Sequence, residues 1–100
     1  MQFIVIAHDA KDEGALERRL SVREQHLEFA AKMFENQKWL FASALLDDDG
    51  NMNGSVIACE FPSENELRKE WLEKEAYVLG KVWDDITIRK AKLAKHSFNK

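Results

Sequence analysis

Two segments of this chain are apolar at nearly every position instead of at alternate ones. They span residues 3–7 (FIVIA) and 39–46 (WLFASALL), and their β-branched and aromatic side chains favour strands. Successive side chains of a strand point to opposite faces of a sheet, so a sheet with one face in water alternates apolar and polar residues. These two segments therefore predict a sheet that is apolar on both faces.

The rest of the chain supplies helices and two further strands. Ser21 with Glu24, and Ser63 with Glu66, match the capping box that begins a helix. We predict strands over residues 3–7, 39–46, 55–61 and 82–93, helices over 13–20, 22–36 and 63–74, and a helical turn over 77–80. The order β-α-β-β-α-β predicts an α+β, ferredoxin-like fold with a four-stranded antiparallel sheet.

Apolar spacing predicts which side of each helix is buried. In the helix over 22–36, Leu27, Ala31 and Phe34 recur at i, i+4 and i+7, so we expect them to face the core. Leu67, Trp71 and Leu72 form the corresponding inner face of the helix over 63–74. Residues 47–54 contain an Asp-Gly-Asn cluster and predict a hairpin loop between the two middle strands.

Two helices can cover only one face of such a sheet. The simplest cover for the second face is the same sheet of another copy, which predicts an isologous homodimer and leaves higher oligomers open. The alternative is that the second face carries ordinary exposed apolar residues, which folded proteins have in number. An apolar patch as large as a sheet face is uncommon on monomers, so the dimer is favoured.

Composition limits the domain count and the class of partner. One hundred residues fit a single domain over 1–100, and a net charge of −3 with interspersed charges does not suit nucleic acid. The longest apolar run has five residues, too few to cross a membrane. The single cysteine, Cys59, fits a cytoplasmic location and is expected to pack as a small apolar residue.

His26 is the most interesting titratable residue. It shares a helical stripe with Arg23, Ala30 and Met33, beside the stripe that is expected to be buried. An imidazole at the edge of a core is suited to general acid or base catalysis, and Arg18, Arg19 and Arg23 lie close enough along the chain to hold an anion. The alternative is a half-buried structural histidine. Asp9 follows the first strand and either caps the next loop or orients a catalytic group.

Metal binding is not expected. Asp49, Asn51, Asn53, Gly54 and Glu60 match the spacing of an EF-hand loop, but a strand and Pro62 follow where a helix is needed. The histidines at positions 8, 26 and 96 have no regular zinc-ligand spacing among themselves or with the cysteine. We therefore predict neither a metal nor another cofactor.

Several stretches of the sequence together resemble the YciI-like (YCII-related) proteins. They are residues 19–27 (RLSVREQHL) after a strand that ends in Ala-His-Asp, residues 54–57 (GSVI), Trp71, and residues 75–78 (EAYV). The resemblance implies a small homodimer of the dimeric α+β barrel type. It also implies a site around a histidine–aspartate pair, and one branch of the family eliminates chloride from a chlorinated hydroxyhydroquinone.

The resemblance assigns residues one by one. His26 matches the family histidine and Tyr77 matches the tyrosine of an Asp-Pro-Tyr triplet, in which Glu75 and Ala76 replace the Asp and the Pro. Glu-Ala is expected to continue a helix, so the carboxylate either pairs with His26 or turns to solvent. Ser43 and the alanine after it stand where many relatives have Gly-Pro, which is expected to alter the shape of the pocket.

Two functions remain open on this basis. The first is a cofactor-independent lyase or isomerase that acts on a small activated aromatic or anionic substrate. In it His26 transfers a proton, Glu75 or Asp9 orients the imidazole, and the substrate is bound by Arg18, Arg23, Ser43 and Tyr77. The alternative is a non-catalytic ligand-binding or assembly module on the same dimer. A monooxygenase on the same barrel rests on fold analogy alone.

Overall fold

The computed structural model describes residues 1–94, and its elements follow the predicted order. The strands are β1 (Gln2–Asp9), β2 (Trp39–Leu46), β3 (Met52–Glu60) and β4 (Trp83–Ala91). The helices are α1 (Ala15–Glu35), α2 (Glu64–Glu70) and α3 (Ala76–Leu79), with a 3₁₀ turn η1 (Leu72–Lys74) between the last two. His96, which the sequence analysis considered as a metal ligand, lies outside the described residues.

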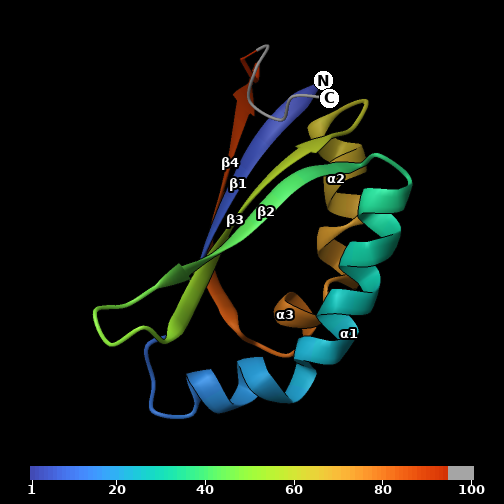
Figure 1. Ribbon diagram of the computed structural model, residues 1–100. Helices are drawn as coiled ribbons and strands as arrows, with labels where there is room; N and C mark the ends of the chain where they lie inside the picture. Colours follow the sequence, from blue (N-terminus) through green and yellow to red (C-terminus); the bar gives the residue numbers. More distant parts are fainter. Residues whose placement is uncertain (95–100) are drawn as a thin grey trace.

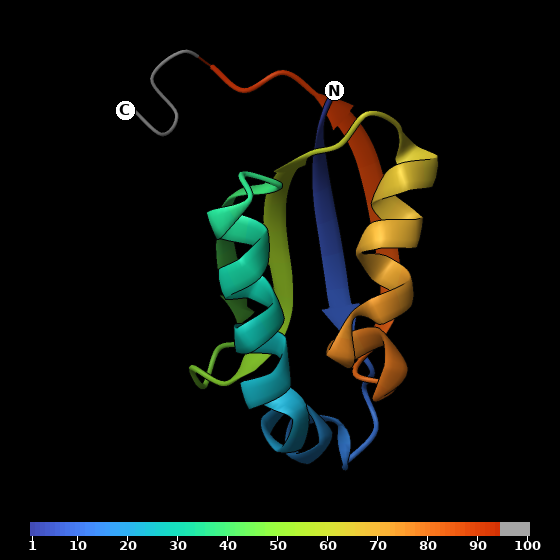
Figure 2. The same cartoon turned by 90° about the vertical axis from the view of Figure 1, so that its right-hand side faces the viewer.

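The four strands form one antiparallel sheet in the order β2-β3-β1-β4. Helices α1 and α2 both lie on the same face of this sheet, so the molecule has two layers (Figure 1). The view from the helical side shows α1 over the β2–β3 half and α2 over the β1–β4 half (Figure 2). The predicted ferredoxin-like α+β fold is confirmed.

Three predicted boundaries are wrong. α1 is one continuous helix instead of two, because the Ser21 hydroxyl donates a hydrogen bond back to the Arg18 carbonyl at 2.8 Å instead of capping a new helix. The hairpin loop is shorter than predicted, since β3 already begins at Met52. The helix over 63–74 is interrupted at Trp71, where α2 ends and the 3₁₀ turn begins. The serine cap at its start is confirmed, since the Glu66 amide donates to the Ser63 hydroxyl.

The predicted buried side of α1 is also wrong. Leu27 and Phe34 are 47% and 41% exposed, and Ala31 is exposed as well. The buried residues of the helix are Ala15, Arg19, His26, Ala30 and Met33. Two of these five are polar, and each is bonded to a buried carboxylate on another element. The spacing of apolar residues takes no account of buried polar pairs. It therefore predicted that the neighbouring side of the helix, with Leu27 and Phe34, is buried.

An aromatic core fills the space between the two layers. Trp39 and Trp71 contact each other with ring centroids 4.9 Å apart, and Trp71 also packs against Phe61 and Trp83. Cys59 is fully buried in the same core, and burial raises the pKa of its thiol to about 12. The thiol is therefore protonated at neutral pH, and its predicted role as a small packed residue is confirmed.

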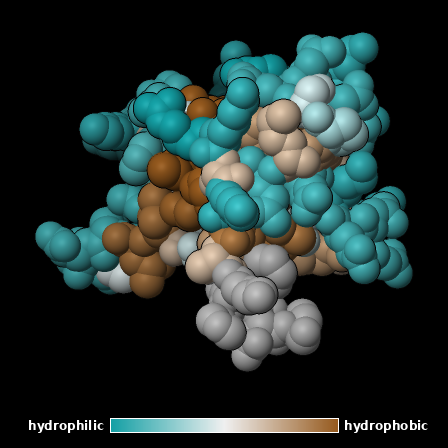
Figure 3. All heavy atoms as spheres, turned by 90° about the horizontal axis from the view of Figure 1, so that it is seen from above, coloured by the Kyte–Doolittle hydropathy of each residue, from teal (hydrophilic) through white to brown (hydrophobic). Residues whose placement is uncertain are grey.

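The face of the sheet that carries no helix is largely apolar over β1, β2 and β3, while β4 places Arg89 and Thr87 there beside Ile4 and Ile6. Cross-strand pairing brings Ile4 beside Ala58 and Ile6 beside Val56, and Phe41 and Leu45 of β2 lie on the same face. A view from above shows apolar side chains gathered on the side of the sheet away from the helices (Figure 3). Within residues 1–94, no helix is long and apolar enough to span a membrane.

Candidate active site

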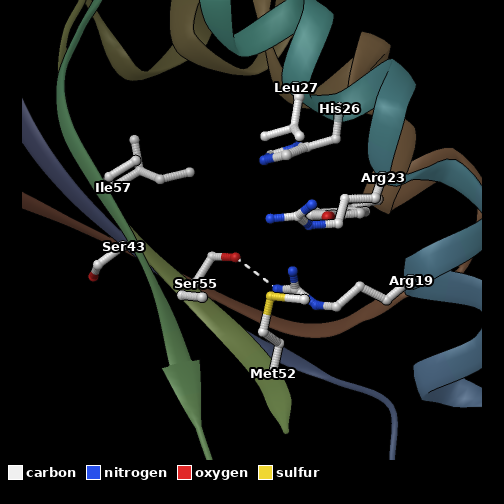
Figure 4. Close-up of a pocket in the computed structure, with 11 residues that line it drawn as sticks. Arg19, Arg23, His26, Leu27, Ser43, Met52, Ser55 and Ile57 are labelled. Atoms are coloured by element: carbon white, nitrogen blue, oxygen red, sulfur yellow. Dashed lines mark hydrogen bonds between the residues drawn. The ribbon is translucent and has the colours of Figure 1, made fainter.

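A cavity of about 180 Å³ lies between α1 and the β2–β3 half of the sheet. Its polar side chains are Arg19, Arg23, His26, Ser55 and Tyr77. Its apolar wall comes from Leu27, Ala42, Ala44, Met52 and Ile57. The close-up shows the arginines and the imidazole reaching from α1 toward the sheet, with Ile57 and Ser55 pointing back at them (Figure 4).

His26 is bonded to a fully buried carboxylate. Its Nδ1 lies 2.5 Å from Oε2 of Glu75, whose exposed fraction is 0%. The other carboxylate oxygen accepts a hydrogen bond from the Trp71 indole at 2.7 Å, and Oε2 also accepts one from the Tyr77 amide at 3.2 Å. Burying a carboxylate is costly unless it is paired and hydrogen-bonded, and these three donors meet that requirement.

The pairing with Glu75 fixes the hydrogen on the imidazole. A carboxylate only accepts hydrogen bonds, so Nδ1 of His26 carries the hydrogen and Nε2 presents its lone pair when the ring is neutral. Nε2 makes no hydrogen bond to any of residues 1–94, and the ring borders the cavity (Figure 4). An oriented imidazole with one free nitrogen is the arrangement that general base catalysis requires.

The Tyr77 ring is stacked on the imidazole. The two ring centroids are 4.0 Å apart with an interplanar angle of 15°, and the Arg19 guanidinium lies 4.5 Å from the centroid of the tyrosine ring. Burial is the largest cause that raises the pKa of Tyr77, so its hydroxyl keeps its hydrogen at neutral pH. The stack fixes the plane of the His26 ring and leaves a protonated hydroxyl at the cavity.

Arg19 of α1 forms hydrogen bonds with residues of β1 and β3. Its Nε donates to Oδ2 of Asp9 at 2.9 Å, and its Nη2 donates to the Gly54 carbonyl and to the Ser55 hydroxyl at 2.8 and 2.9 Å. Arg19 appeared in the sequence only as one member of an arginine cluster. Its spacing of seven residues from His26, two turns along the same side of a helix, was the signal that would have singled it out.

The other predicted site residues are distributed differently. Asp9 pairs with Arg19, not with His26. Arg18 does not line the cavity; it pairs with Asp12 at 2.8 Å and donates to the Lys81 carbonyl. The pKa of Asp12 is lowered to about 2, chiefly by its hydrogen bond to this arginine. Ser43 borders the cavity with its backbone, while its side chain points away (Figure 4), as expected from its pairing with Val56 on the opposite face.

The segment that resembled a calcium loop has a different conformation. Residues 52–60 form strand β3, so the second helix of an EF-hand is not present there. In the part of the chain that the structure describes, no three histidine, cysteine, aspartate or glutamate side chains cluster in a way that could hold a metal ion.

Comparison with known proteins shows the family of the chain. The model of the YCII-related domain matches residues 1–92. The chain belongs to the YCII-related family. An uncharacterized protein of Haemophilus influenzae is 29% identical over 96 residues, which cover 89% of this chain and 94% of the relative. The protein YciI of Escherichia coli is 29% identical over 95 residues, with the same coverage.

Solved structures share the fold of this YCII-related chain. The 5-chloro-2-hydroxyhydroquinone dehydrochlorinase of Burkholderia phenoliruptrix, solved with 2,5-dihydroxybenzoquinone, superposes with a TM-score of 0.79 at 22% identity, covering 96% of this chain and 98% of its own. A putative antibiotic biosynthesis monooxygenase of Deinococcus radiodurans gives 0.52 at 16% identity, covering 94% and 95%. The dimeric α+β barrel class predicted from the sequence is the class of these neighbours.

The Glu75–Ala76 pair of this YCII-related chain occupies the position where the family resemblance implies Asp-Pro. The expectation that it would simply continue a helix is wrong. The chain becomes extended at Glu75 (φ −71°, ψ 126°), which is the N-cap of α3, and its own carboxylate accepts the Tyr77 amide. The longer side chain of glutamate caps the helix and still reaches His26.

Proposed function

We propose that this YCII-related protein is a cofactor-independent lyase or isomerase that moves a proton on a small activated ring. One observation carries the proposal: the imidazole of His26 is held at Nδ1 by the fully buried Glu75, while Nε2 is free at the edge of a cavity. A structural histidine needs a partner, but it does not need a second nitrogen without a hydrogen bond from residues 1–94 beside a partly apolar cavity.

The chemistry follows from the two nitrogens. Nε2 accepts a proton from the substrate, and the imidazolium that forms is stabilised by the Glu75 carboxylate at Nδ1. With a chlorinated hydroxyhydroquinone, a ring hydroxyl loses its proton while a proton is added at the carbon that bears chlorine. Chloride then leaves with the electron pair of the C–Cl bond as the pair of a second O–H bond forms the quinone C=O, so the net change is loss of HCl. The Tyr77 hydroxyl donates to an oxygen on which negative charge develops. Proton transfer by a positioned side chain contributes about 10²- to 10⁴-fold, enough for a substrate that is already acidic.

The size of the cavity supports a single-ring substrate. It encloses about 180 Å³. An engineered apolar cavity of roughly 150 Å³ in another protein binds benzene, so one six-membered ring with small substituents fits this space. The dehydrochlorinase that shares the fold is named for a substrate with one such ring, which supports the choice of a chlorinated hydroxyhydroquinone as the first test compound.

The proposal is tested with the purified protein and 5-chloro-2-hydroxyhydroquinone. We expect chloride to be released faster than without protein, with one chloride formed for each substrate consumed. Related dihydroxybenzenes without chlorine are incubated in D₂O, and ring deuteration is followed by NMR. If neither chloride release nor solvent deuterium incorporation exceeds the background rate, the proposal is wrong and the non-catalytic binding module takes its place.

We also propose that a second copy covers the helix-free face of the sheet. The residues that support this are the partly buried Ile4, Ile6 and Val56 at its centre, with Phe41 and Leu45 beside them. A two-fold axis would place this apolar surface against itself, which removes it from water in both copies.

The Ile6→Lys variant tests this dimer, because it would place two ammonium groups in a buried interface. By sedimentation velocity at micromolar concentration we expect a two-chain mass for the wild type and a one-chain mass for the variant. Leu79→Lys is the matched control, since Leu79 is 67% exposed on α3, far from this face. It should keep the two-chain mass. A wild type that sediments as one chain would contradict the dimer.

A further inference from the structure

The basic side chains around the cavity differ in how they are paired. Two of its three basic side chains have a carboxylate partner: Arg19 is paired with Asp9 at 2.9 Å, and His26 with Glu75 at 2.5 Å. Asp9 and Glu75 are only 6% and 0% exposed, so each of them is committed to its own partner and is shielded from anything that enters the cavity.

Arg23 is the third basic side chain, and it is different. Within residues 1–94 its guanidinium has no ion pair and no hydrogen bond, and it extends from α1 into the cavity between Arg19 and His26 (Figure 4). Arg18, five residues earlier on the same helix, is held by both oxygens of Asp12 instead. Arg23 is therefore the positive charge at the cavity that no carboxylate of residues 1–94 pairs. With His26 neutral, the negative charge of Glu75 balances it formally, but that carboxylate is buried behind the imidazole.

The neutral polar groups of the cavity add donors. The Ser55 hydroxyl accepts from Nη2 of Arg19, which leaves its own hydrogen available. Tyr77 keeps its hydrogen because burial raises the pKa of its hydroxyl. Apart from Nε2 of His26, the side-chain polar groups around the cavity thus offer hydrogens and no strong acceptor. A ligand that fits must bring the acceptor oxygens itself.

We propose that this cavity selects a monoanion on a single ring, with its ionised oxygen on Arg23 and its transferable proton toward His26. The proposal rests on the proposed function and defines the substrate class. A neutral ring gives up the charge-assisted hydrogen bond to the exposed guanidinium of Arg23, and a dianion brings a second charge for which residues 1–94 offer no second unpaired cation at the cavity. Arg23 and His26 are three residues apart on α1, so their Cβ atoms are about 5–6 Å apart and both can reach one ring.

Three compounds of nearly the same shape separate charge from size: isophthalamide (neutral), 3-carbamoylbenzoate (one negative charge) and isophthalate (two). Their dissociation constants are measured by titration calorimetry at low ionic strength. We expect the wild type to bind the monoanion about tenfold more tightly than either of the others, a difference of about 1.4 kcal/mol. The preference should fall as salt is added, because Arg23 is exposed on its outer side.

Two arginine variants test whether Arg23 causes the preference for the monoanion. Arg23→Gln should bind the neutral and singly charged compounds within about twofold of each other, whereas Arg18→Gln should keep the tenfold preference. Equal binding of all three compounds by the wild type, or the same loss in both variants, would overturn the inference. Binding is measured without turnover, so this inference and the proposed function can fail separately. If only the inference is wrong, the protein still releases chloride but shows no preference for the monoanion. Circular dichroism of each variant confirms that it is folded.

Discussion

Replacing His26 with asparagine should lower kcat/KM for the chlorinated hydroxyhydroquinone by about 10²- to 10⁴-fold, the range that general acid–base catalysis contributes. Asparagine keeps an N–H group that can donate to Glu75, so the buried carboxylate stays paired, but it has no basic nitrogen at the cavity. The rate of chloride release at saturating and at limiting substrate measures the effect. Ring deuteration of unchlorinated analogues should fall in parallel, because the same nitrogen removes the proton.

His8→Asn is the matched control for this substitution. His8 is exposed on β1 and does not line the cavity, so its replacement should leave chloride release within about twofold of the wild type. If His26→Asn retained more than a tenth of the wild-type activity, His26 would be a structural residue and another group would have to move the proton. A loss of activity that came with loss of the far-ultraviolet spectrum would reflect unfolding instead, so both measurements are made on the same samples.

The layout of the fold could be predicted from the sequence because it follows from local patterns. The mostly apolar segments 3–7 and 39–46, the serine cap at Ser63 and the Asp-Gly-Asn turn were enough to order the elements, and the helix-free face is apolar over β1–β3 as predicted. The cap at Ser21 was misleading, since a mid-helix serine can satisfy its hydroxyl within the helix.

The orientation of α1 could not be predicted, and that orientation determines the site. It depends on two contacts between elements: Arg19 with Asp9 on β1, and His26 with Glu75 at the N-cap of α3. Spacing along one helix shows which residues share a side, but not which side is buried when paired polar groups compete with leucine and phenylalanine. The exposed Leu27 and Phe34 are the consequence.

Glu75 should be the residue whose loss destabilises the protein most. Glu75→Ala leaves the imidazole of His26, the indole of Trp71 and the amide of Tyr77 without their acceptor. Removing one partner of a buried, hydrogen-bonded pair costs about 3–5 kcal/mol. For a domain of this size, such a loss lowers the melting temperature by at least about 12 °C.

Urea unfolding at one fixed protein concentration measures this loss, since the stability of the proposed dimer would depend on concentration. Glu73→Ala is the control. It removes the same side chain from an exposed position two residues earlier, and we expect a change within about 0.5 kcal/mol. A loss below 1 kcal/mol for Glu75→Ala would mean that the hydrogen bonds to this carboxylate contribute little to stability.

Glu75→Gln separates the charge of this residue from its shape. The carboxylate accepts from three donors, whereas an amide has one oxygen acceptor and must point its NH₂ group at a former donor. The Trp71 indole keeps the oxygen as its acceptor, and the imidazole can become an acceptor by moving its hydrogen from Nδ1 to Nε2. The Tyr77 amide, which shared Oε2 with His26, loses its acceptor. We therefore expect the nitrogen-15 shifts of His26 to show this exchange of tautomers and chloride release to fall at least 10²-fold, while the free energy of unfolding changes less than in Glu75→Ala. An unchanged tautomer together with unchanged activity would show that the pair holds the fold and does not orient a base.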